Sequence, residues 1–192
     1  AQALLPVLDD NPERAVALAQ KAIDAFPEQF LNANTRCMAR KLGLQSIEEQ
    51  DTALVEDLWQ LMAEHKLDFT LTFRRLADLA HERDNPEQTV STLFEFPQAL
   101  QPWLARWRTR LDQETLSGAE RQRSMDLANP ALIPRNHLVE AAIAAATDRD
   151  DLSVFNRLMD VLEEPHVYRA ELAQFATPPR PEQVVQQTFC GT

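Results

Sequence analysis

The sequence predicts an all-α fold: a bundle-like array of about seven to nine helices, followed by an extended, proline-containing C-terminal tail. Three observations favour this class. Only 3 of the 192 residues are glycine, so few positions suit the tight turns of β-hairpins. Apolar residues recur at spacings of three and four along most of the chain. Hydrophobic residues make up 44% of the sequence, enough to bury a core.

The first two expected helices lie near the start of the chain. Asn11, Pro12 and Glu13 have the pattern of a helix N-terminus, with a capping side chain, a proline in the first turn and an acid. Pro27 predicts the start of a second, antiparallel helix that ends at Gly43. The apolar residues expected on the buried faces are Val16, Ala19, Ile23, Phe26, Phe30, Leu31 and Met38.

The next two helices are predicted by capping patterns. Ser46 and Glu49 resemble a capping box before the apolar stripe from Leu54 to Met62. Asp68 is expected to cap a fourth helix. Its buried face would hold Phe69, Phe73, Leu76, Ala77 and Ala80. The stretch 89–96 alternates enough for a short strand but has no evident partner strand, so strand and helical turn both stay open.

Four further helices complete the array. A strong amphipathic pattern runs from Leu100 to Leu111, and Ser117 with Glu120 predicts a capping box for the next helix. Pro130 and Pro134 bracket a connection. The last two helices are marked by Leu138, Val139, Ala142, Ile143 and Ala146, and then by Leu152, Phe155, Leu158, Met159 and Leu162.

The composition changes after residue 162, where prolines replace helical periodicity. We therefore expect a helical domain at 1–162 and an extended tail at 163–192. The chain opens on Ala1 and runs directly into apolar residues. We expect it to be a fragment with an N-terminal neighbour.

Charge and composition argue against several classes of protein. The formal net charge of −11 would repel nucleic acid at long range. No apolar run reaches the length of a membrane span and no signal peptide opens the chain, so a cytoplasmic protein is expected. The two cysteines are far apart and match no zinc or disulfide pattern.

No set of catalytic residues is recognisable in the sequence. The three isolated glycines cannot form a phosphate-binding loop. The triplet at Asp68 resembles the metal-binding Asp-Phe-Gly of kinases but lacks its glycine, so helix capping is the preferred interpretation. None of the four histidines has metal-ligand spacing, and no metal site is expected. His81 lies beside Glu82, Arg83 and Asp84, a group that we expect to be solvated.

Two features are kept as candidate sites. Arg135, Asn136 and His137 gather polar side chains at an expected helix start, which predicts either an anion or interdomain contact or simple helix capping. Cys190 lies near the end of the chain and is a candidate redox thiol. Cys37 falls inside an expected helix and is predicted to be buried.

Several segments, taken in order, resemble the C-terminal part of the SelO (selenoprotein O) family of protein adenylyltransferases. They are ARKLGL, DFTLTFRRLADL, MDLANPALIPRNHLVEAAI, DLSVFNRLMDVLEEP and the terminal TFCGT. The resemblance covers nearly the whole chain. The IPRNHLVE block and the cysteine near the terminus are its most specific elements.

The resemblance implies a pseudokinase that transfers AMP from ATP, with Mg²⁺ or Mn²⁺, onto hydroxyl side chains of protein substrates. The family's nucleotide, metal and catalytic residues would lie in a kinase-like domain upstream of Ala1. This chain would then be inactive alone and hold no cofactor. Only Cys190 matches a family position with a role, and Gln187 stands where some members have a second cysteine.

An interaction scaffold is the alternative. The stretch NPERAVALAQKAIDAFPEQ has the alanine spacing and terminal proline of a tetratricopeptide-like unit. A solenoid needs about three stacked repeats, and no second copy is evident at a period of ~34 residues.

Overall fold

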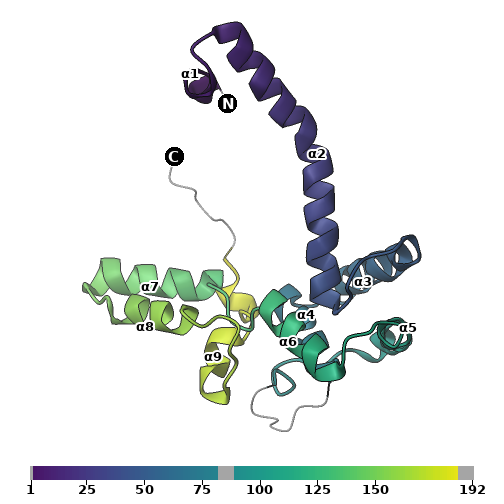
Figure 1. Cartoon of the computed structure of the whole chain (residues 1–192). Coiled ribbons are helices and arrows are strands. Elements are labelled where there is room, and N and C mark those ends of the chain that lie inside the picture. Colours follow the sequence, from purple (N-terminus) through teal and green to yellow (C-terminus); the bar gives the residue numbers. More distant parts are fainter. Residues whose placement is uncertain (1, 82–88, 186–192) are drawn as a thin grey trace.

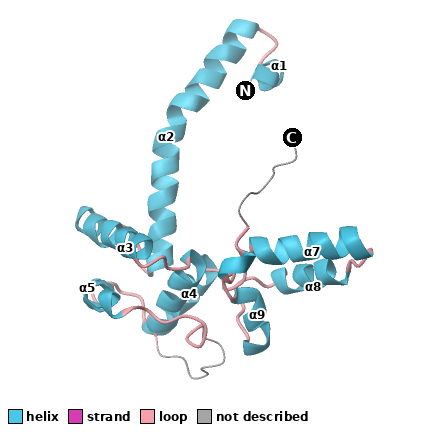
Figure 2. Ribbon diagram, turned by 180° about the vertical axis from the view of Figure 1, so that it is seen from behind, coloured by secondary structure: helices cyan, strands magenta, loops and turns pink. Residues whose placement is uncertain are grey.

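The computed structural model describes residues 2–81 and 89–185, and helices form its whole regular structure there. Nine α-helices are present in these ranges, without a strand (Figures 1 and 2). The predicted all-α class is therefore confirmed. The helices are α1 Leu5–Leu8, α2 Pro12–Leu42, α3 Thr52–Glu64, α4 Phe69–Leu79, α5 Gln101–Leu111, α6 Gly118–Ala128, α7 Asn136–Arg149, α8 Ser153–Leu162 and α9 Ala173–Ala176.

The predicted pair of helices near the N-terminus is one continuous helix of 31 residues, α2. The predicted N-cap is confirmed, because the Asn11 side chain accepts hydrogen bonds from the amides of Glu13 and Arg14. Pro27 lies inside the helix instead of starting a new one. Proline removes one backbone donor and bends a helix without always ending it, and α2 bends partway along its length (Figure 1). The tetratricopeptide alternative, which needs a helix–turn–helix unit, loses its support.

The C-terminal end of α2 belongs to the main core. Gly43 ends the helix in the left-handed conformation, as expected. Trp103 and Trp107 of α5 are fully buried, and their indole N–H groups donate to the carbonyls of Leu54 and Leu42 at 2.8 and 2.9 Å. Further buried members are Leu104 of α5 and residues of α3, α4 and α6, among them Leu58, Met62, Phe73, Leu76 and Met125.

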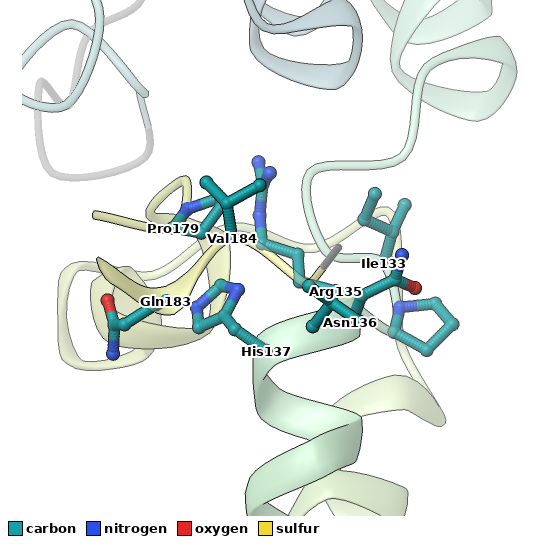
Figure 3. Close-up of a pocket in the computed structure, with 9 residues that line it drawn as sticks. Ile133, Arg135, Asn136, His137, Pro179, Gln183 and Val184 are labelled. Atoms are coloured by element: carbon teal, nitrogen blue, oxygen red, sulfur yellow. The ribbon is translucent and has the colours of Figure 1, made fainter. Parts of the chain in front are cut away.

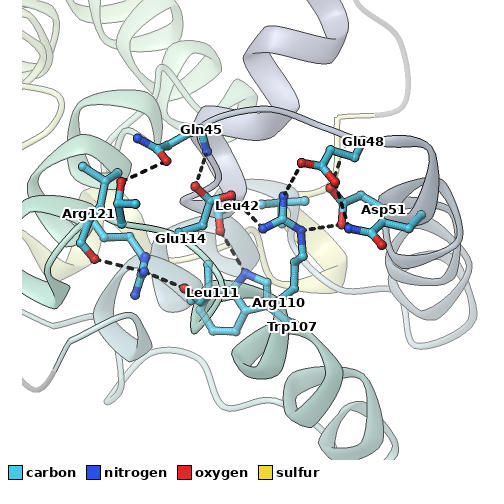
Figure 4. Close-up of polar contacts among 12 residues, drawn as sticks. Leu42, Gln45, Glu48, Asp51, Trp107, Arg110, Leu111, Glu114 and Arg121 are labelled. Carbon is cyan, nitrogen blue, oxygen red and sulfur yellow. Dashed lines mark hydrogen bonds and ion pairs between the residues drawn. The ribbon is translucent and has the colours of Figure 1, made fainter.

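An ion-pair cluster joins α5 to the turn before α3 (Figure 4). The guanidinium of Arg110 donates to the carboxylates of Asp51 and Glu114, both at 2.7 Å. The hydrogen bonds that Arg110 donates, first to Asp51 and then to Glu114, raise its pKa, whereas burial acts to lower it. The capping box here is formed by Glu48 and Asp51 rather than by the predicted Ser46 and Glu49, because a short 3-10 helix precedes α3.

A second core cluster connects α4 and α8 to the C-terminal segment. Buried side chains of the segment that follows α8, Tyr168 and Leu172 among them, pack with Leu71 of α4 and Val161 of α8. The short helices Ala170–Leu172, α9 and Pro181–Gln183 interrupt the segment that was expected to be extended. Residues 89–93 form a bend and a turn, residues 94–96 have no regular structure, and Val90 is buried in this same cluster.

Several predicted apolar stripes are only partly covered. In α2 no residue between 16 and 37 is buried, and Phe26 and Phe30 are 63% and 59% exposed. Their rings stack on one another at 5.9 Å between centroids. The expected burial of this face is therefore wrong for the described chain. The periodicity reports an apolar face correctly, but the described elements that contact α2 leave most of this face exposed.

Candidate functional site

Arg135 lies immediately before α7, where the sequence predicts a helix start. Its backbone is extended, and its carbonyl accepts from the amides of Leu138 and Val139. No side chain caps this end of α7. The predicted position of the polar cluster at a helix N-terminus is confirmed, while side-chain capping of α7 is not observed.

The guanidinium of Arg135 is held by the carboxylate of Asp68. The two side chains form a fork, with Nη1 and Nη2 donating over 2.8 and 3.2 Å. Asp68 also accepts the amide of Leu71 at 2.8 Å and so caps α4, as predicted. The Arg135 side chain is 5% exposed. A bidentate pair of this kind fixes orientation as well as distance, so Arg135 ties the N-termini of α4 and α7 together.

His137 lines a cavity of about 260 Å³ beside this ion pair (Figure 3). The cavity lies between the start of α7 and the segment that ends the described chain. Its lining residues are Ile133, Pro134, Arg135, Asn136, His137, Pro179, Gln183, Val184 and Val185. All three predicted cluster residues therefore share one pocket.

Two buried polar atoms in this region have no hydrogen-bond partner within the described residues. They are Nε of Arg135 and Nδ1 of His137. Burial lowers the pKa of His137, and the nearby charge of Arg135 lowers it further. The imidazole is therefore neutral at neutral pH. It can accept or donate one hydrogen bond toward a polar group in the pocket.

The pocket combines a neutral imidazole, an N-terminal helix turn and an arginine whose charge is matched by Asp68. Such a site can orient a polar group by hydrogen bonds, while the carboxylate of Asp68 offsets much of its attraction for an anion. The anion or interdomain contact of Arg135, Asn136 and His137 stays a prediction.

Cys37 lies within helix α2, as the sequence predicts. Cys37 is exposed, so its predicted burial is wrong. It lies on α2 directly before Met38, which is the first of the buried residues at the C-terminal end of this helix. It lines a pocket of about 400 Å³ with Arg36, Arg40 and residues of α6. Cys190 and Gln187 lie outside the described residues, and the redox role of Cys190 stays a prediction.

Lys41 is a contact residue that no sequence pattern indicated. Its ammonium donates to the carbonyl of Ala128 and to Oδ1 of Asn129, both at 3.2 Å. It also lies over the rings of Phe69 and Phe73, at 5.5 and 5.0 Å from their centroids. Burial lowers its pKa. Its hydrogen-bond partners at the C-terminal end of α6, Ala128 and Asn129, are nearly 90 residues away, so only the fold reveals this contact.

Other candidate chemistry is limited in the described part of the chain. No group of three or more histidine, cysteine or acidic side chains there could hold a metal ion. Within the same ranges, no helix has the length and apolar character that a bilayer crossing demands. The backbone carbonyl of His81 accepts a hydrogen bond from the Gln122 side chain. Its expected neighbours Glu82, Arg83 and Asp84 lie outside the described residues.

Comparison with known proteins places this geometry in a wider context. Residues 3–163 match the sequence profile of the family described as Protein adenylyltransferase SelO. The chain is 45% identical, over 192 residues, to the Protein nucleotidyltransferase YdiU of Bradyrhizobium sp. (strain BTAi1 / ATCC BAA-1182) and to that of Rhizobium meliloti (strain 1021). It is 43% identical over 194 residues to that of Rhodopseudomonas palustris (strain BisB5). Each alignment covers 100% of this chain and 39% of the relative.

Proposed function

Because the chain belongs to the SelO family of protein adenylyltransferases, we propose that it is the helical part of an enzyme that transfers AMP from ATP to hydroxyl groups of proteins. The observation that carries this proposal is the identity of 45% over the entire chain with a relative named as a protein nucleotidyltransferase. The chain spans 39% of that relative's length. We assign ATP, the divalent metal and the catalytic residues to the other part, a kinase-like domain.

The structure supports a docking role for this chain. Between residues 16 and 31, α2 carries a row of exposed apolar side chains. A row of exposed apolar side chains on one helix is typical of a site of contact with another protein surface. The stacked rings of Phe26 and Phe30 lie in this row. We propose that this face of α2 packs against the kinase-like domain.

The activity is tested by incubation with labelled ATP, Mg²⁺ or Mn²⁺ and candidate proteins. The 192-residue chain alone should transfer no AMP, whereas the full-length Bradyrhizobium relative should label protein. Reproducible AMP transfer by the chain alone would show that the catalytic residues have been assigned to the wrong part. No transfer by the full-length relative would contradict the proposed activity.

The docking role is tested in a chimera in which this chain replaces the matching region of the Bradyrhizobium relative. Replacing Phe26 and Phe30 by serine should lower its thermal stability and its AMP transfer. The two side chains are mostly exposed, so the isolated chain should keep its stability. Glu28→Gln with Asn32→Ser, on the opposite side of α2, is the matched control. Equal behaviour of the two chimeras would refute docking through this face.

A further inference from the structure

Helices α7 and α8 form a hairpin whose apolar seam is left open. The hairpin extends to one side of the molecule, away from α3 and α5, in both views (Figures 1 and 2). A groove of about 420 Å³ runs between the two helices, and every residue that lines it is apolar. Ile143 of α7, Phe155 and Met159 of α8, and Leu152 just before α8 are each 48% to 57% exposed.

The lining of the groove favours a helix as its occupant. A small ligand needs a few polar groups to orient it, and this lining offers none. An extended peptide would bring backbone N–H and C=O groups that need partners. A helix satisfies these groups internally and presents only side chains. The 14 residues of α7 span roughly 21 Å, enough for three or four anchors at helical spacing.

The charge around the groove defines the chemistry of that helix. Residues 136–164 contain seven Asp and Glu residues and two Arg residues. One of these arginines, Arg157, lies over the ring of Phe175. Glu140, Asp160 and Glu163 are exposed and adjoin lining positions along the helices. A second copy of the chain, with a net charge of −11, would bring like charges together. A helix with basic residues beside its apolar stripe matches both properties.

We propose that the α7–α8 groove binds a basic amphipathic helix of another protein. Apolar anchors of that helix fill the seam, and its lysine or arginine side chains pair with the acidic residues at the groove edges. This groove is distinct from the row of exposed apolar side chains on α2. Its proposed role does not depend on the proposed AMP transfer.

The probe is an 18-residue synthetic peptide of leucine and lysine with leucine at positions i, i+3, i+4 and i+7. Binding is measured by fluorescence anisotropy of the labelled peptide on the 192-residue chain. A peptide with the same leucine spacing and glutamate in place of lysine should bind at least about tenfold more weakly. A lysine peptide with the same composition but scrambled leucine positions should also bind at least about tenfold more weakly. Equal binding of all three peptides would overturn the proposal.

Two groups of variants locate the contact. Phe155→Ala with Met159→Ala should weaken binding at least about tenfold, a loss of about 1.4 kcal/mol. Leu127→Ala, at an exposed apolar residue of α6 outside the groove, is the matched control and should bind as the unchanged chain does. Glu140→Gln with Asp160→Asn should weaken binding and flatten its dependence on salt. Loss of binding only in the Leu127 variant would place the contact elsewhere.

Two further measurements decide between possible occupants. The molar mass from light scattering should show that the chain does not form a dimer through this groove. A dimer that Phe155→Ala with Met159→Ala dissociates would identify a second copy as the occupant and overturn the proposal. The full-length Bradyrhizobium relative should also bind the lysine peptide. Binding by the chain but not by this relative would show that the rest of the polypeptide fills the groove.

Discussion

At the scale of single residues, Gly43 shows how one position satisfies two demands. Its φ of 75° lies in the left-handed region that side chains disfavour. A Cβ atom there would also lie 2.7 Å from Sδ of Met125 and 2.9 Å from Cγ of Arg121. The sequence indicated the turn because glycine commonly follows a helix. It could not indicate the close approach of α6, since that depends on residues about 80 positions away.

His137 leads to a prediction about pH. Burial and Arg135 hold its pKa below the usual 6.5, so the unfolded chain takes up a proton at a higher pH than the folded chain does. The free energy of unfolding should therefore fall as the pH drops from about 7 toward 5. In His137→Asn, this fall should be shallower by up to about 1.4 kcal/mol per pH unit. Urea unfolding at several pH values measures the slopes.

The control for this prediction is Asn136→Ala, which changes an exposed neighbour that does not titrate. It should keep the slope of the unchanged chain. An NMR titration of the imidazole resonances should also show that His137 titrates at a lower pH than an ordinary histidine does. An unchanged slope in His137→Asn would contradict the effect of burial on this side chain.

At the scale of elements, the Arg110 cluster joins α5 to the turn before α3. The side chains of Asp51 and Glu114 are 2% and 5% exposed. Arg110→Met would leave both carboxylates without their cation and should lower the free energy of unfolding by about 3–5 kcal/mol. Adding Asp51→Asn should cost less than the sum of the two single changes, because the two residues act as a pair. Chemical denaturation of the four proteins measures this coupling.

The same helix offers a matched control in Arg106, which pairs with Asp57 at 2.6 Å near the surface. The side chains of this pair are 53% and 44% exposed. Arg106→Met should cost less than about 1 kcal/mol. Equal losses at Arg106 and Arg110 would mean that burial does not set the strength of these pairs.

The positions of the helices were largely predictable from the sequence. Which helix faces are buried against other elements was not predictable. Asn11, Asp68 and Ser117 cap helices as expected, because capping depends on residues two or three positions away. Trp103 and Phe155 lie on equally clear apolar stripes, yet the first is buried and the second is 48% exposed. The difference lies in which element packs opposite each stripe.

The candidate site follows the same division. The cluster at Arg135 could be placed at a helix start from local sequence. Its main partner, Asp68, lies 67 residues away and could be recognised only as a cap for its own helix. The cavity beside His137 also depends on residues 179–185. No periodicity marks that segment in the sequence.

At the scale of the whole molecule, stability should be uneven along α2. Residues 38, 39 and 42 are buried in the main core, whereas none between 16 and 37 is buried. Native-state hydrogen exchange should therefore give opening free energies at least about 2 kcal/mol lower for amides 18–30 than for amides 39–42. Uniform protection along the helix would contradict this expectation. If the proposed kinase-like domain packs on α2, its binding should remove the difference.

The attachment of α2 has a mechanical consequence. A helix of 31 residues is about 46 Å long. Among the contacts that fix its base are the Trp107–Leu42 hydrogen bond and the bonds between Lys41 and Asn129. A rotation of only 5° at this base would move the far end by about 4 Å, roughly the width of a methyl group. A few hydrogen bonds at the base of α2 therefore determine how accurately the opposite end of this helix is positioned.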